Sequence, residues 1–169
     1  MWARNAWHGK EARGRRYGKL AGVAATVDYE VRRARDEQEL HSAIALRHQV
    51  FCLEQGVPQH EEVDGRDPEG IHLVAVAGGQ LLGTLRLLVV GRTVQLSRLA
   101  VRDSVRRRGI ATALLAAADD ESRRAGATRI VLHAQTYARA LYDRHGYQPR
   151  GAVFREAGIE HVAMEKELT

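Results

Sequence analysis

Residues 105–112 read Val-Arg-Arg-Arg-Gly-Ile-Ala-Thr and join two apolar segments of the chain. Residues 94–101, which come before the octet, are typical of a strand, and residues 110–118, which follow, have the spacing of a helix. The octet therefore lies where a strand is followed directly by a helix. Gly109 and Ala111 have small side chains, so the backbone there can come close to a ligand.

The predicted helix has no capping side chain at its start. No Ser, Thr, Asp or Asn directly precedes Gly109, and the nearest such residue is Ser104. The first N–H groups of the helix are then free, and a free helix start attracts anions. The three arginines beside it indicate a multiply charged anion such as a pyrophosphate. A solvated basic turn and a nucleic-acid-binding patch are the alternative interpretations.

Length and composition favour one soluble domain. The chain has 169 residues, 44% of them hydrophobic, with a mean hydropathy of −0.37. No apolar run approaches the ~18 residues of a membrane helix, and the N-terminus lacks the apolar segment of a signal peptide. The single cysteine, Cys52, excludes an internal disulfide and lies among apolar residues. We therefore expect a cytoplasmic protein without a membrane contact, in which Cys52 behaves as a small hydrophobic residue and not as a nucleophile.

Most of the net charge lies in an N-terminal segment. Residues 1–28 hold six Lys or Arg and two Asp or Glu, whereas the remainder holds 20 basic and 19 acidic residues. The segment is rich in Arg, Gly and Ala and shows little periodicity, so we expect residues 1–28 to be a disordered, basic extension. A single domain is expected over residues 29–169. Weak contact with an acidic partner is the functional alternative for the extension.

The domain has an α/β pattern with a mixed, mostly antiparallel sheet. Gly78-Gly79 between two apolar runs predicts a hairpin, and Asp36 is a predicted helix cap. Residues 56–70 predict a long acidic loop. We expect strands at residues 29–33, 71–77, 81–90, 93–101, 129–133, 147–154 and 159–167. Helices are expected from Asp36 through Arg47, over 49–55, from Gly109 toward Gly126, and over 137–145.

Four segments of the chain, which follow one another in the order that a known family shows, resemble that family. Arg106-x-x-Gly109-x-Ala111 after an apolar strand is similar to the acetyl-CoA-binding motif of the GCN5-related N-acetyltransferases (GNAT). Residues 138–147 resemble the late helix of that family. Residues 47–67 and 156–164 are similar to its ElaA-like branch. The resemblance covers about residues 29–168; one common feature differs, because Gln135 stands where many relatives carry Asn.

The resemblance implies a GNAT fold, in which helices flank the sheet and a central strand pair splays apart. It also implies direct acetyl transfer from acetyl-CoA to a primary amine of a small molecule or peptide, without an acyl-enzyme. One strand of the splayed pair would bind the pantetheine arm and polarise the thioester carbonyl. The residues expected to bind the cofactor are Leu99, Ala100, Val101, Arg106, Arg107, Arg108, Gly109, Ile110, Ala111, Thr112 and Gln135.

Two proton transfers need candidate residues. Tyr142 is the expected general acid for the leaving thiolate, since a phenol stays protonated at neutral pH; a packing role is its alternative. The candidate general bases are Glu54, Glu62, Asp64 and His161, and Glu54 is our choice beside Tyr142. Gln55, Asp64 and His161 are expected to bind the acceptor.

Several other interpretations stay open. A CoA-binding sensor without turnover would keep the fold, and a nucleic-acid-binding protein would use the basic extension, although the domain itself is nearly neutral. A synthase with a longer acyl donor is a further alternative, and a homodimer is left open. The eight histidines and the lone cysteine have no metal-ligand spacing, so we expect no metal.

Overall fold

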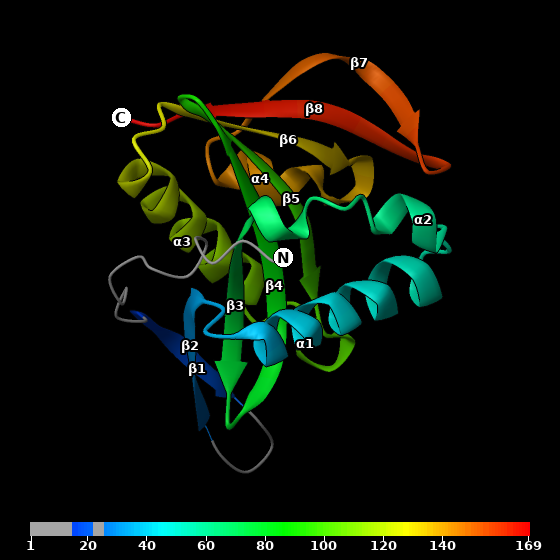
Figure 1. Ribbon diagram of the computed structural model, residues 1–169. Coiled ribbons are helices and arrows are strands. Elements are labelled where there is room, and N and C mark those ends of the chain that lie inside the picture. The colour runs from blue at the N-terminus through cyan, green and yellow to red at the C-terminus, as the bar shows by residue number, and fades with distance from the viewer. Residues whose placement is uncertain (1–14, 22–25) are drawn as a thin grey trace, which may run out of the picture.

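An eight-stranded sheet in the order β1-β2-β3-β4-β5-β6-β8-β7 carries helices on both faces (Figure 1). The structure is a computed structural model that describes residues 15–21 and 26–169. The strands are β1 (Arg15–Ala21), β2 (Thr26–Arg33), β3 (Ile71–Ala77), β4 (Gln80–Val90), β5 (Thr93–Val101), β6 (Arg129–Gln135), β7 (Gln148–Glu156) and β8 (Ile159–Glu167). The α-helices are α1 (Glu37–Arg47), α2 (Gln59–Glu62), α3 (Ile110–Arg124) and α4 (Arg139–Arg144). A π-helix, η1 (His48–Glu54), continues α1, and the short 3-10 helices are η2 (Asp67–Glu69), η3 (Asp103–Val105) and η4 (Thr136–Ala138).

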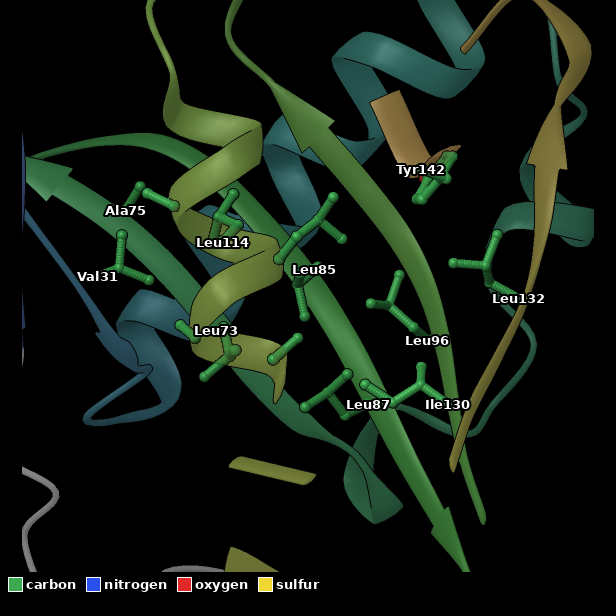
Figure 2. Packing of buried hydrophobic residues seen from close by; sticks show 14 of the residues in the cluster. Val31, Leu73, Ala75, Leu85, Leu87, Leu96, Leu114, Ile130, Leu132 and Tyr142 are labelled. Atoms are coloured by element: carbon green, nitrogen blue, oxygen red, sulfur yellow. The ribbon is translucent and has the colours of Figure 1, made fainter. Parts of the chain in front are cut away.

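Strand β3 shows how the sheet divides the core into two layers. Leu73 and Ala75 belong to the larger apolar cluster, which includes Leu114 of α3 (Figure 2). Val74, between them, belongs to a second cluster with Ala43 of α1. Because successive side chains of a strand point to opposite faces, α1 and α3 cover opposite faces of the sheet. The mixed α/β architecture predicted from the sequence is confirmed.

The turns that the sequence predicts are present. Gly78 and Gly79 have φ values of 54° and 77°, the left-handed pair that a tight hairpin needs, and they join β3 to β4. The side chain of Asp36 accepts a hydrogen bond from the Glu39 N–H at 2.8 Å and so caps α1. Local polar and glycine signals therefore located these element ends correctly.

Among the described strands, β5 and β6 form the one parallel pair, and they are joined only at one end. Their register runs from Thr93 opposite Arg129 to Gln95 opposite Val131 and no further. Beyond that point β5 continues to Val101 and β6 to Gln135 without pairing to each other. The backbone groups of β5 that face this opening therefore have no strand partner there. The splayed central pair expected from the resemblance is confirmed.

A bulge distorts β5 beside the opening. Arg86 pairs with Ser97 and Thr84 with Ala100, so the register shifts between these two pairs of β4 and β5. Arg98 lies within the shift and has a φ of 59°, an unusual value for a residue other than glycine. Bulges of this kind re-aim side chains, and they are common next to active sites.

The expected N-terminal boundary differs from the structure. Residues 15–21 form β1, which pairs antiparallel with β2, and β2 itself begins at Thr26 rather than at residue 29. An edge strand is held by backbone hydrogen bonds to its neighbour, and these leave little trace in composition. The expectation of disorder for residues 1–14 and 22–25 lies outside the described residues.

Smaller differences concern loops and strand ends. The predicted loop 56–70 contains α2 and η2, and the predicted helix 137–145 is the short η4 followed by α4. Strands β6 and β7 each extend two residues beyond the predicted ends, to Gln135 and Glu156. Within the part of the chain that the structure describes, no helix is long and apolar enough to cross a membrane.

Candidate active site

The turn between β5 and α3 presents an open helix end. Gly109 is the N-cap, with a φ of 84°, and no side chain caps the helix. The Ala113 N–H donates to the Gly109 carbonyl, so the N–H groups of Ile110, Ala111 and Thr112 have no acceptor within the helix. A Cβ built on Gly109 would meet nothing within 4 Å. This geometry suits an anion that lies against the helix end.

The arginines of the turn are engaged differently. Arg106 donates from Nη2 to Oε2 of Glu54 at 2.6 Å and from Nε to the Val101 carbonyl at 2.9 Å. Arg107 and Arg108 are exposed, and Arg107 has a φ of 61°. Glu54, our predicted general base, is therefore paired with a predicted cofactor ligand. The sequence did not indicate this pairing, because the two residues lie 52 positions apart.

Tyr142 of α4 lies between β5 and β6, where the two strands have separated (Figure 2). Its side chain belongs to the larger apolar cluster with Leu96 and Leu132 and is 7% exposed. The ring of Tyr147 contacts it edge-on at 5.8 Å. Burial raises the pKa of Tyr142 above its ordinary value, and the nearby Tyr137 adds to this shift. The phenol is therefore held protonated at neutral pH.

A polar chain crosses the open end of the splayed pair. Gln135, the last residue of β6, donates to Oε1 of Gln55 at 2.9 Å. Gln55 in turn donates from Nε2 to the hydroxyl of Tyr137 at 3.0 Å. Gln55 and Gln135, both predicted as site residues, are thus brought together. Tyr137 was not predicted as a site residue; its place at the start of the predicted helix 137–145, directly before the segment that resembles the family's late helix, was the available signal.

The predicted cofactor strand lines the same opening. Ala100 is buried at 2% exposure, and Leu99 and Val101 are half-buried at the end of β5. All three follow the bulge at Arg98 and lie beyond the last pairing between β5 and β6. The end of β5 leads through η3 and the arginine turn to the N-terminal end of α3.

His161 of β8 lies directly opposite Gln135 in the sheet register. Its imidazole Nδ1 is 2.8 Å from the carbonyl oxygen of Ile159, and the residue is 8% exposed. Phe154 of β7 stacks on the ring, with the centroids 6.0 Å apart. The neighbouring His133 pairs instead with Glu156, at 2.9 Å from Nδ1. His161 is thus placed at the open end of the splayed pair.

The acidic loop between η1 and β3 is bound by buried arginines. Arg47, with no exposure, donates to Oε1 of Glu62 at 2.5 Å and to Oδ1 of Asp67 at 2.7 Å. Arg86, 2% exposed, binds both oxygens of Asp64 at 2.8 and 2.6 Å. Arg98 donates to the Glu62 carbonyl at 2.9 Å. We call these residues the arginine–carboxylate cluster.

The contacts of this cluster do not support the roles predicted for its acids. Hydrogen bonds from Arg86 hold the pKa of Asp64 far below its usual range, so this carboxylate is a poor proton acceptor. Glu62 is 3% exposed and paired with Arg47. Both acids anchor the loop to β4, β5 and α1 rather than face an open site. Burial raises the pKa of the Cys52 thiol, with the Glu62 charge adding to it, which fits the predicted absence of a nucleophile.

A crevice of about 700 Å³ adjoins the arginine turn on the α1 side. Its lining includes Gln49, Glu54, Leu81 and Arg102, but neither Tyr142 nor His161. Glu54 is therefore the one predicted site residue in its lining. Among the described residues, no three His, Cys, Asp or Glu side chains are grouped to hold a metal ion.

Comparison with known proteins identifies the family. The model of the acetyltransferase (GNAT) domain matches residues 31–168. The chain is 33% identical over 135 residues to the N-acetyltransferase YjcF of Bacillus subtilis, covering 79% of this chain and 96% of YjcF. An acyl-CoA N-acyltransferase structure from Pseudomonas aeruginosa superposes with a TM-score of 0.73 at 32% identity, over 83% of this chain and 99% of that one. Escherichia coli ElaA shares the fold, with a TM-score of 0.73 at 21% identity over 83% and 99% of the two chains.

These matches cover most of the chain, and the chain belongs to the GNAT family of acetyltransferases. It is an acyl-CoA N-acyltransferase. The family assignment made from the four sequence segments is confirmed, and the fold of ElaA is shared.

Proposed function

We propose that this member of the GNAT family transfers the acetyl group of acetyl-CoA directly to a primary amine of a small molecule or peptide. The observation that carries the proposal is the early end of pairing between β5 and β6, at Gln95 and Val131, which leaves Tyr142 in the opening. The open N-terminal end of α3 follows β5 along the chain and adds a second element of the proposed cofactor site.

The residues present fit the cofactor. The N–H groups at the start of α3, the open space at Gly109 and the side chains of Arg107 and Arg108 would hold the pyrophosphate. The unpaired edge of β5 from Leu99 to Val101 would hydrogen-bond the pantetheine arm, and Gln135 would border it from β6. Arg106 would reach a phosphate only by leaving Glu54.

Acetyl-CoA supplies an acetyl group activated as a thioester. Around it, the β5 backbone N–H groups beside the bulge would stabilise negative charge on the carbonyl oxygen. The Tyr142 phenol would donate its proton toward the departing sulfur. Because burial raises the pKa of Tyr142, the tyrosinate form is unfavourable, and its proton has to be replaced within the same turnover. Gln55 and Tyr137 would border the acceptor amine.

Replacement of Tyr142 by Phe tests the proposal. The ring and its contact with Tyr147 are kept, and only the hydroxyl is lost. Thiol release from acetyl-CoA should fall about 10²–10⁴-fold in kcat, with little change in acetyl-CoA affinity. Tyr147→Phe is the matched control, because Tyr147 is fully buried and its hydroxyl has no partner among the described residues. It should keep its turnover.

Measurements of thiol release, acetyl-CoA binding and nucleic-acid binding distinguish the rival functions. A CoA-binding module without turnover would show no thiol release in any variant, while acetyl-CoA binding would persist. A nucleic-acid-binding protein would bind DNA or RNA with a steep dependence on salt. Undiminished turnover in Tyr142→Phe would remove this phenol from the mechanism. Homodimer formation and a cytoplasmic location stay predictions from the sequence.

A further inference from the structure

We propose that His161 is the general base that takes the proton of the acceptor ammonium group through its Nε2 atom. This rests on the proposed function, and it names a residue that the family assignment does not. The proposal combines the hydrogen bond at Nδ1, the place of His161 in the sheet, and the pairing of the carboxylates predicted as bases.

The hydrogen bond at Nδ1 sets the tautomer of His161. A carbonyl oxygen can only accept, so the contact of Nδ1 with the Ile159 carbonyl at 2.8 Å requires the hydrogen to be on Nδ1. The neutral ring then carries its lone pair on Nε2. Nε2 has no hydrogen-bond partner among the described residues and is not sealed from solvent, although the residue is 8% exposed. A nearly buried imidazole thus presents a bare proton acceptor.

The place of His161 in the sheet puts this acceptor at the open end of the splayed pair. Residues directly opposite in an antiparallel pair project to the same face, and His161 is opposite Gln135. Gln135 begins the polar chain through Gln55 to Tyr137. The stacked ring of Phe154 fixes the imidazole from β7. His161 therefore shares a face with the groups that would border the acceptor.

The predicted carboxylate bases are all paired with arginine. Glu54 binds Arg106 at 2.6 Å, and Glu62 binds Arg47 at 2.5 Å. Arg86 holds the pKa of Asp64 far below its usual range. A carboxylate in such a pair gives up its arginine contact when it accepts a proton, which opposes base catalysis. Nε2 of His161 has no such competitor among the described residues.

Strands β6 and β7 and the turn η4 pack against β8. The titratable groups that they place on the face of His161 are mostly paired with one another. His133 pairs with Glu156, and Arg150 with Glu165 of β8 itself. Tyr137 accepts from Gln55, and burial raises its pKa.

The protons and bonds of the step balance. The acceptor ammonium nitrogen carries three protons and the amide product one, so two protons leave the nitrogen. His161 takes the first, which frees the amine lone pair to form the C–N bond as the C–S bond breaks. Tyr142 gives its proton to the sulfur, and the second ammonium proton restores the phenol. The proton on His161 then passes to solvent.

The tautomer is tested without turnover. Imidazole ¹⁵N spectra of the full chain at pH 8 should show the hydrogen of His161 on Nδ1 and a bare Nε2, with the signal assigned by its loss in His161→Gln. A hydrogen on Nε2 at that pH overturns the proposal, whether or not the chain transfers acetyl groups. This measurement separates failure of the base from failure of the proposed function.

The kinetic test compares His161→Gln with His145→Gln. His145 makes the same kind of Nδ1 contact, with the Leu141 carbonyl at 2.8 Å, but at the end of α4. With acetyl-CoA and spermidine, glycinamide and a lysine peptide as probe amines, His161→Gln should lower kcat/KM at pH 7 by about 10²–10⁴-fold. The deficit should shrink as the pH rises toward the pKa of the amine, because the free amine then needs no base. His145→Gln should match the parent chain, and a deficit in His161→Gln that stays constant with pH overturns the proposal.

Discussion

Two groups of arginines in this chain use the same side chain for opposite purposes. In the arginine–carboxylate cluster, Arg47 and Arg86 are buried, with 0% and 2% exposure, and their guanidinium groups bind acids of the same chain. In the turn before α3, residues 106–108 are exposed beside an open helix end. A buried guanidinium requires fixed partners, whereas an exposed one can exchange them for a ligand.

The comparison shows which partners the acidic side chains of residues 56–70 bind. A loop with five acidic residues near a predicted site suggested proton acceptors, but three of the five are ligands of the buried arginines. Arg98, at the bulge of β5, adds a further contact to this loop, because it donates to the Glu62 carbonyl. The cluster therefore holds the acidic loop in place, and its carboxylates are paired rather than available as proton acceptors.

The largest expected effect is on stability, and it distinguishes the two groups directly. Arg47→Met removes the shared partner of two carboxylates and leaves buried Glu62 with weakened compensation. The free energy of unfolding should fall by about 3–5 kcal/mol. Arg107→Met, the same substitution in the turn, should change it by less than about 0.5 kcal/mol. Urea unfolding at pH 7 measures both, and equal losses in the two variants would refute the distinction.

The second effect concerns binding at the turn. Gly109→Asp would place a carboxylate at the open helix end, where an anion is expected. Gly109→Asn has the same shape without the charge, and both residues tolerate the left-handed conformation that the φ of 84° requires. The acetyl-CoA dissociation constant of the Asp variant should exceed that of the Asn variant by at least about tenfold, or ~1.4 kcal/mol. Calorimetry decides, and equal affinities would place the pyrophosphate elsewhere.

The smallest effect is a change in acid sensitivity. Arg86 lowers the pKa of Asp64 in the folded chain, so the unfolded chain binds this proton more readily. The stabilisation is therefore complete above about pH 5 and is lost as the pH falls through and below about 4, the ordinary Asp pKa. Asp64→Asn should cost about 1 kcal/mol at pH 7, since the pair is partly screened by water, and less at pH 3. The free energy of unfolding is measured for the parent chain and for Asp64→Asn at pH 3, 5 and 7. A difference between the two that is the same at all three pH values would contradict this assignment.

The sequence predicted the elements whose signals are local. The Gly78-Gly79 hairpin, the Asp36 cap and the open start of α3 all depend on residues within one turn of each other, and all are present. Strand β1 was missed because its partner, β2, supplies the hydrogen bonds that define it.

The candidate site also contains features that local sequence motifs predict and features that depend on contacts between distant segments. The turn at Gly109 and the place of Tyr142 followed from motifs that are continuous in the chain. Pairings between distant segments did not: Glu54 with Arg106 is 52 positions apart, and Arg98 with the Glu62 carbonyl is 36. The sequence shows which side chains are charged, but only the fold shows which of them pair with one another.

The short contact between β5 and β6 also affects how the chain folds. Strands β3, β4 and β5 follow one another through tight turns, so their pairing closes only short loops. Thr93 and Arg129, by contrast, lie 36 residues apart, with α3 between them. Loop closure becomes more costly with length, so we expect β3–β5 to assemble first and β6–β8 to dock late. Of the two junctions that β5 makes, the one with β6 is then the later to form, after the one with β4.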